Sequence, residues 1–259
     1  MVLRESLLSR ISRSADAVER FFSSPTVSAV TFWIILLYGA SLRLVYRLMS
    51  NGKILRDEYT YLKRIAVAAE AGLQNSTSPN FLIFLGTVFY RNPEQTELLL
   101  RGINFAASLA LIVVAYFLGR EVFNGRWAGL VTMLFAAITP DLVRFGCSMM
   151  REPLYLLIFA LLLLQCVLYW KSPSCVRALF CCLLSLMGLW ARYEGAELFF
   201  FLPLTLFTGV LLRRFPLRTA LTGLAVFLSG SFLFILLFLL LLPVYYQKVW
   251  LKFTTHLPG

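Results

Sequence analysis

The stretch EPLYLLIFALLLLQCVLYW, residues 152–170, decides the fold. It is 19 residues long, and its single charged residue, Glu152, stands at its start. An α-helix rises about 1.5 Å per residue, so a helix of this length nearly spans the hydrocarbon core of a bilayer, which is about 30 Å thick. Pro153 suits the first turn of a helix, where its missing N–H removes no hydrogen bond. The stretch therefore predicts a membrane-spanning helix.

Six more apolar segments predict six more spans, at about residues 27–48, 97–118, 127–139, 176–191, 195–212 and 219–242. Hydrophobic residues make up 59% of the 259 residues and charged residues 14%, whereas a soluble domain has about 45–50% and about 25%. This composition excludes a soluble enzyme, a disordered chain and a disulfide-rich scaffold. We expect an all-α, polytopic membrane helical bundle of about seven transmembrane helices, in a single domain over residues 26–245.

Polar segments surround and interrupt the predicted spans. Residues 1–25 are basic, and their apolar residues recur at helical spacing, which is typical of an amphipathic helix on a membrane surface. The long loop 49–96 holds a helical pattern at 57–71 and an apolar run at 81–90 that is too short to cross a bilayer. We therefore expect two interfacial helices in this loop. Residues 246–259 form a short tail.

The charge distribution predicts an orientation in the membrane. The formal net charge is +11, for which membrane lipids are the expected partner and nucleic acid is not. The short turns on the N-terminal side hold more basic residues than the short turns on the opposite side. We therefore expect a cytoplasmic N-terminus and an outer 49–96 loop. If the source is bacterial, we expect the plasma membrane. We expect Arg43 and Arg47, near the outer end of the first span, to snorkel toward the interface.

Under this orientation, most acidic residues fall on the outer side, close to the ends of predicted helices. Arginines accompany them, and Glu97 and Arg101 are spaced to pair on one helix. Carboxylates and guanidinium groups beside a bilayer can bind a phosphate and a polar acceptor together. The plain alternative is that polar loops pair their own charges. The candidate substrate-binding residues are Arg101, Arg144, Arg151, Glu152, Arg192 and Glu194.

Asp57 and Glu58 are the candidate catalytic residues. They open the first interfacial helix, where Asp57 would serve as an N-cap and the helix dipole would favour Glu58. In the functional interpretation, a carboxylate at this boundary takes a proton from an acceptor. Capping and catalysis are compatible.

The sequence predicts no metal centre of its own. The single His256 stands in the tail, the five cysteines form no C-x-x-C motif, and neither pattern indicates zinc or a disulfide framework. Asp57, Glu58 and Glu152 offer oxygen ligands of the kind that divalent cations prefer. The sequence therefore identifies no cofactor. It is compatible with a divalent metal but does not require one.

In the order of these features, residues 27–215 resemble GT-C-type integral-membrane glycosyltransferases, particularly the protein O-mannosyltransferase and aminoarabinose-transferase-like branch. The resemblance rests on Asp57-Glu58-Tyr59-Thr60-Tyr61, on Leu118-Gly119-Arg120, on Thr139–Gly146 followed by Arg151-Glu152-Pro153, and on Arg192-Tyr193-Glu194-Gly195. The segment Ser78-Pro79-Asn80 is similar to a family segment that usually carries a histidine, which is missing here. Many relatives continue beyond seven spans, so this chain resembles a short or truncated member.

The resemblance implies a sugar transferase with a polyprenyl- or dolichyl-phosphate-sugar donor and an acceptor of unknown identity on the non-cytoplasmic face. It makes Asp57 the general base and implies inversion at the C1 carbon of the sugar. Two alternatives stay open: a non-catalytic or truncated membrane subunit, and a lipid or solute transporter. Charges within spans would favour a transporter, but the predicted charges gather at helix ends and we find no inverted repeat.

Overall fold

The computed structural model describes residues 19–22, 24–50, 56–71 and 80–241, and within these ranges it contains helices and no strand. The prediction of an all-α fold is therefore confirmed. The elements are α2 (Pro25–Met49), α3 (Arg56–Ala71), α4 (Phe81–Val88), α5 (Pro93–Phe123), α6 (Arg126–Ile138), α7 (Pro140–Gly146), α8 (Glu152–Lys171), α9 (Cys175–Ala191), the 3-10 helix η2 (Tyr193–Phe200), α10 (Phe201–Leu211) and α11 (Leu217–Leu241).

All seven predicted apolar segments are helical. Among the described residues, five helices are long and apolar enough to cross a membrane: α2, α5, α8, η2 continued by α10, and α11. The pair α6 and α7, which is bent by 63° at Thr139, counts as a sixth crossing if it is one broken span and not a re-entrant loop. The apolar helix α9 is shorter, at 17 residues. The chain is thus a multi-pass membrane bundle, although length and composition alone support five or six crossings rather than seven.

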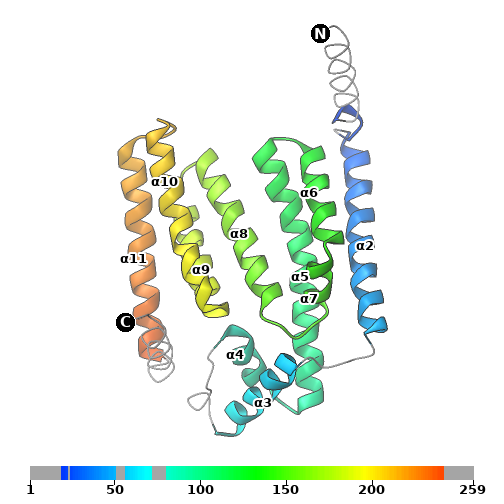
Figure 1. Cartoon of the computed structure of the whole chain (residues 1–259). Coiled ribbons are helices and arrows are strands. Elements are labelled where there is room, and N and C mark those ends of the chain that lie inside the picture. Colours follow the sequence, from blue (N-terminus) through cyan, green and yellow to red (C-terminus); the bar gives the residue numbers. More distant parts are fainter. Residues whose placement is uncertain (1–18, 23, 51–55, 72–79, 242–259) are drawn as a thin grey trace, which may run out of the picture.

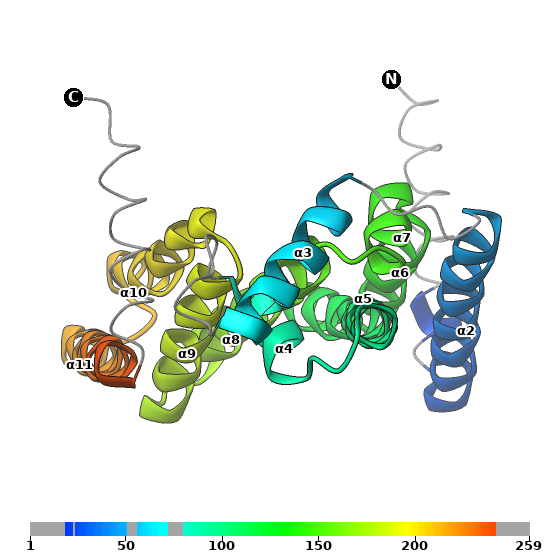
Figure 2. The same ribbon diagram turned by 90° about the horizontal axis from the view of Figure 1, so that it is seen from below.

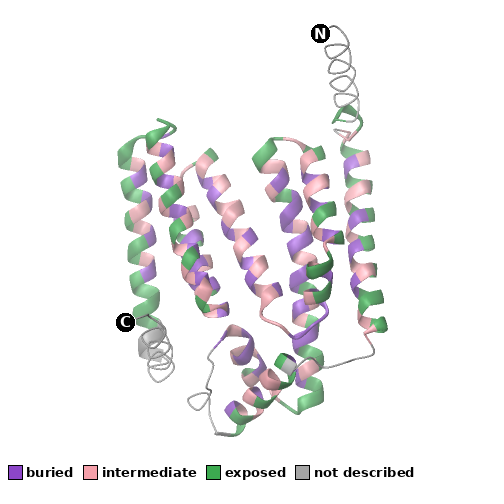
Figure 3. Ribbon diagram, viewed as in Figure 1, coloured by how far each residue is buried: buried purple, intermediate pink, exposed green. Residues whose placement is uncertain are grey.

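The helices run alternately up and down and stand side by side (Figure 1). One group packs α2, α5 and α6 around Ile112 and Met133, and a second packs α8 to α11 around Leu162 and Leu198. Contacts between α5 and α8 join the two groups. Large apolar side chains such as Trp33 and Phe207 are exposed on the outside, while buried residues face the neighbouring helices (Figure 3). This distribution suits a bundle whose outer surface meets lipid.

Both predicted interfacial helices are present, and they lie across one end of the bundle (Figure 2). We call this the α3 end. Ile65 of α3, Leu82 and Ile83 of α4, and Leu100 of α5 are fully buried together. The Asn80 side chain caps α4 by accepting a hydrogen bond from the Ile83 N–H at 2.8 Å. The predicted surface helix at 1–25 lies largely, and the tail at 246–259 entirely, outside the described residues.

The structure departs from the prediction in two places. The second span was expected to begin at Glu97, but α5 begins at Pro93 because Asn92 caps it, accepting from the Gln95 N–H at 2.8 Å. No helix was predicted between the spans at 127–139 and 152–170, but residues 140–146 form the short helix α7. Pro140 does end α6, as its missing N–H requires, and it also serves as the first residue of the next helix.

Membrane orientation is a prediction that labelling can test. Glu94 is exposed at the α3 end, and Cys175 is an exposed native thiol at the opposite end. In right-side-out vesicles, an impermeant maleimide is expected to label a Glu94→Cys variant directly and Cys175 only after permeabilisation. The other native cysteines are buried, so they add little background. The reverse pattern would place the α3 end in the cytoplasm.

Candidate functional site at the α3 end

The structure brings the sequence-predicted site residues to the same end of the bundle. Asp57 and Glu58 stand in the first turn of α3, and Arg101 lies on α5. The other predicted residues lie on three further elements: Arg144 on α7, Arg151 and Glu152 at the start of α8, and Arg192 and Glu194 between α9 and η2. They divide into two polar clusters and two exposed residues.

The first cluster is centred on a buried ion pair between Glu58 and Arg101. Both Glu58 oxygens meet the guanidinium, Oε1 at 3.1 Å from Nη1 and Oε2 at 3.1 Å from Nη2. The two side chains are 1% and 7% exposed. Arg101 Nε also donates to Glu97 at 2.7 Å, which confirms the predicted pairing. This two-pronged geometry is the strong form of an arginine–carboxylate contact, and it fastens α3 to α5.

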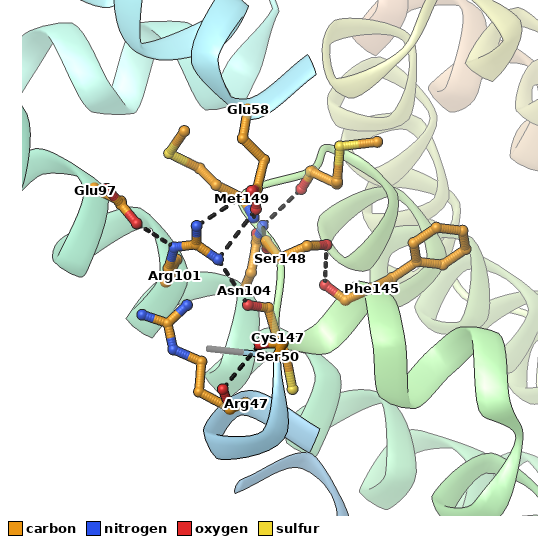
Figure 4. A network of polar contacts seen from close by, with 11 residues as sticks. Arg47, Ser50, Glu58, Glu97, Arg101, Asn104, Phe145, Cys147, Ser148 and Met149 are labelled. Atoms are coloured by element: carbon orange, nitrogen blue, oxygen red, sulfur yellow. Dashed lines mark hydrogen bonds and ion pairs between the residues drawn. The ribbon is translucent and has the colours of Figure 1, made fainter. Parts of the chain in front are cut away.

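The same cluster holds the segment 147–150, which leads from α7 to α8 (Figure 4). Arg101 donates to the Cys147 carbonyl, and Glu58 accepts from the Met149 N–H. The Asn104 amide donates to the carbonyls of Ser148 and Met150, at 2.8 and 2.6 Å. A non-helical segment inside a membrane protein needs partners for its backbone groups, and these three side chains supply them.

This geometry changes the roles of two predicted residues. Both Glu58 oxygens are engaged by Arg101 and by the Met149 N–H, which argues against its predicted role as a catalytic residue. Arg101 is neutralised by two carboxylates, which argues against its predicted role as a phosphate ligand. Sequence periodicity carried a signal for Glu58, since it shares a helix face with Leu62, Ile65 and Ala69.

The second cluster lies around the start of α8 and the turn before η2. Arg192 donates to Glu152 at 3.3 Å and to Glu194 at 3.0 Å. The hydrogen bond that Arg192 donates to the Glu194 carboxylate is the main cause that raises the pKa of Arg192. A close backbone approach shapes this turn, because a Cβ atom at Gly195 would stand 2.3 Å from the Gly188 carbonyl oxygen. Only glycine fits there.

Aromatic rings line this second cluster. The Arg151 guanidinium lies 5.7 Å from the Tyr193 ring centre, and that of Arg192 lies 5.5 Å from the Tyr155 ring. The Tyr155 hydroxyl donates to Glu197 at 2.6 Å. Aromatic faces and charged groups side by side suit a ligand that has both polar and apolar surfaces.

Tyr61 of α3 lies within electrostatic range of both Asp57 and the second cluster. Burial is the main cause that raises the pKa of the Tyr61 hydroxyl. The charge of Arg151 lowers this pKa, while those of Glu152 and Asp57 raise it further. Asp57 stands one helical turn before Tyr61, on the same face. Asp57, Arg151 and Glu152 therefore all lie close enough to Tyr61 for their charges to act on its hydroxyl.

Asp57 and Arg144 are both exposed, and within the described residues neither side chain has a hydrogen bond or ion pair. Because α3 begins at Arg56, Asp57 lies inside the first turn and is not the predicted N-cap. Its carboxylate is free to meet a solute at the end of the bundle. Arg144, on α7, meets the first cluster only through its main chain, where its carbonyl accepts from the Cys147 N–H at 3.2 Å.

Buried polar atoms without a hydrogen-bond partner gather at the α3 end. Among the described residues there are five such side-chain atoms, and all lie there: Arg47 Nη1, Thr96 Oγ1, Asn104 Oδ1, Arg151 Nε and Glu152 Oε2. Buried polar groups are normally paired, so we expect water or a ligand to be the partner of these atoms. Two of them belong to predicted substrate-binding residues.

Metal binding has no ready-made donor set here. The described residues contain no group of three or more His, Cys, Asp or Glu side chains placed to hold an ion. Of the three carboxylates suggested above, Glu58 is engaged by Arg101. A cavity of about 210 Å³ lies at the opposite end, lined by Tyr169, Cys175, Arg218 and Thr222 among others, and it includes none of the predicted site residues.

Sequence reasoning missed Asn104 and misjudged Arg43. Arg43 was expected to snorkel, but it is completely buried and donates to Ser108 and to main-chain carbonyls of α2 and α6. No local pattern marks either residue, since all their side-chain partners except Gly39 lie more than 40 positions away along the chain. Comparison with protein-family models and with curated proteins finds no match to this chain.

Proposed function

We propose that the chain is a membrane glycosyltransferase that moves a sugar from a polyprenyl- or dolichyl-phosphate carrier to an acceptor at the α3 end, on the non-cytoplasmic side. The proposal rests on the resemblance described above and on one structural observation. Among the described residues, the Asp57 carboxylate has no hydrogen bond or ion pair, and it lies at the α3 end together with Arg151 Nε and Glu152 Oε2, which are buried and also lack a hydrogen-bond partner.

In this proposal Asp57 is the general base. It takes the proton of the acceptor hydroxyl or amine as that group attacks C1 of the sugar. The bond from C1 to the phosphate oxygen breaks, and its electron pair stays with the lipid phosphate. Glu58, one residue further on, is locked to Arg101 and so fixes the start of α3 against the bundle. Asp57 thereby has a rigid support.

Arg151 is the best candidate to receive the charge on the departing phosphate. It stands at the start of α8, its Nε has no partner in the described part of the chain, and Tyr193 supports its planar face. Arg192 is already shared between Glu152 and Glu194, so its role is to orient Glu152. The apolar helices beside this end would hold the lipid tail.

The assay for this function is sugar transfer from a polyprenyl-phosphate-linked donor by the purified chain in lipid nanodiscs. Release of free lipid phosphate with formation of a glycosylated acceptor would support it. Solute or lipid flux in proteoliposomes without transfer would favour the transporter. Binding of the donor without turnover would favour a non-catalytic subunit.

An Arg151→Lys variant is expected to weaken donor binding by about 10–100-fold, because lysine cannot donate two parallel hydrogen bonds to phosphate. Titration of a labelled donor lipid measures this. The corresponding Arg101→Lys variant is expected to lower thermal stability instead, because Arg101 is bound to two carboxylates. Arg214→Lys, at the opposite end, is the matched control. Equal donor affinity in Arg151→Lys and in the unmodified chain would move the phosphate site elsewhere.

A further inference from the structure

The junction between α6 and α7 leaves main-chain carbonyls without helical partners. In an unbroken helix, the Ala136 carbonyl would accept from the N–H of residue 140, but Pro140 has none. The Ala137 carbonyl loses its partner because the chain bends by 63° at this point. In a membrane protein such groups need another donor.

Arg43 of α2 supplies those donors. Its Nη2 donates to the Ala136 carbonyl at 3.3 Å and its Nη1 to the Ala137 carbonyl at 3.1 Å. Nη1 also bonds the Gly39 carbonyl, and Nε donates to Ser108 Oγ at 2.6 Å. Arg43 is 0% exposed. All four acceptors are uncharged oxygens, so the guanidinium acts here as a planar group of several N–H donors.

The same contacts hold α7 and the residues after it. Ser108, which receives Arg43 Nε, in turn donates to the Leu142 carbonyl at 3.4 Å. Gly146 ends α7 directly against this pair: a Cβ there would stand 2.5 Å from Ser108 Oγ and 3.3 Å from Arg43 Nε. The Cys147 thiol then donates to the Arg43 carbonyl at 2.9 Å. Arg43 therefore contacts the end of α6, just before α7, and Cys147, just after α7.

We infer that Arg43 is a positioning residue: it replaces the lost helical donors at the α6–α7 break and so fixes the bend that delivers residues 147–152 to the α3 end. It acts through α7, at a distance from Arg151 and Glu152. The importance of this placement for sugar transfer rests on the proposed function. The structural role of Arg43 at the α6–α7 break does not depend on that proposed function.

The accessibility of Cys147 reports on this placement without any activity assay. Cys147 is 6% exposed, and burial raises the pKa of its thiol, so a maleimide reacts slowly while the segment is closed. Cys166 and Cys182 are buried in the second helix group, at 6% and 0% exposed, and serve as internal references. Peptide-resolved mass spectrometry measures all three thiols in one full-length sample.

In an Arg43→Met variant, labelling of Cys147 is expected to rise at least about tenfold, while labelling of Cys166 and Cys182 stays unchanged. Arg43→Lys should give a smaller rise in Cys147 labelling, because lysine keeps the charge and some N–H donors but not the planar arrangement of the guanidinium donors. If Arg43→Met does not fold, Arg43→Lys is interpreted in the same way. Arg214→Met, which removes an exposed arginine at the opposite end, is the control.

Two results would overturn the inference. Unchanged Cys147 labelling in a folded Arg43 variant would show that the bend holds without this side chain. An equal rise at Cys147, Cys166 and Cys182 would show a general contribution to stability and no specific one. If Cys147 opens selectively in the Arg43 variant but the unmodified chain itself does not transfer sugar, this inference stands and the proposed function does not.

Discussion

Asp57→Asn is expected to lower sugar transfer by roughly 10²–10⁴-fold, the usual contribution of a general base. Asparagine has almost the same shape but cannot take the acceptor proton. Asp57 is exposed and unpaired within the described residues, so the substitution removes only a favourable charge near the start of α3. Its effect on stability should stay within about 1 kcal/mol. Initial rates of transfer in nanodiscs, with thermal melting of the same sample, measure both quantities.

Glu58→Gln looks like the natural control from the sequence, but the structure makes it unsuitable because Glu58 is buried in an ion pair. Glu94→Gln is a better match. Glu94 is also an exposed acid in the first turn of a helix, on α5 at the same end, and it should transfer sugar normally. Full activity in a folded Asp57→Asn variant would refute the mechanism, and Glu152 would be the next base to test.

The spans were predictable because bilayer thickness sets a length of apolar sequence that is visible without a structure. The interfacial helix α3 was predictable for a similar reason, since Leu62, Ile65 and Ala69 recur at helical spacing. The same spacing extends back to Glu58 and separates it from Asp57 by one step of about 100° around the helix. The contrast between a buried and an exposed acid in this pair therefore follows from periodicity.

The bend between α6 and α7 shows what the sequence could not provide. Pro140 predicts the end of a helix, but it does not predict where the freed carbonyls find donors. Those donors come from Arg43, 93 and 94 positions away. Likewise Asn104 reaches carbonyls 44 and 46 positions along the chain. Such pairs are set by how helices meet in three dimensions, and local spacing carries no trace of them.

The division of roles between the two neighbouring acids makes a second strong prediction, this time about stability. Glu58→Gln is expected to destabilise the protein by about 3–5 kcal/mol, the usual effect of removing one partner of a buried ion pair. The two side chains are 1% and 7% exposed, so solvent screening is small. Because Glu97 still pairs with Arg101, the loss should fall near the lower end of that range. Thermal melting in the presence of a fixed detergent measures it.

A double-mutant cycle with Arg101→Met isolates the pair. If Glu58 acts mainly by holding Arg101, the double variant should be less unstable than the sum of the two single variants, by about 0.5–3 kcal/mol. The matched single control is Asp57→Asn, one residue away, which should melt close to the unmodified protein. Equal stability of Glu58→Gln and Asp57→Asn would mean that α3 does not depend on this ion pair. The rigid support proposed for Asp57 would then have to come from the apolar contacts of Ile65, Leu82 and Leu100 instead.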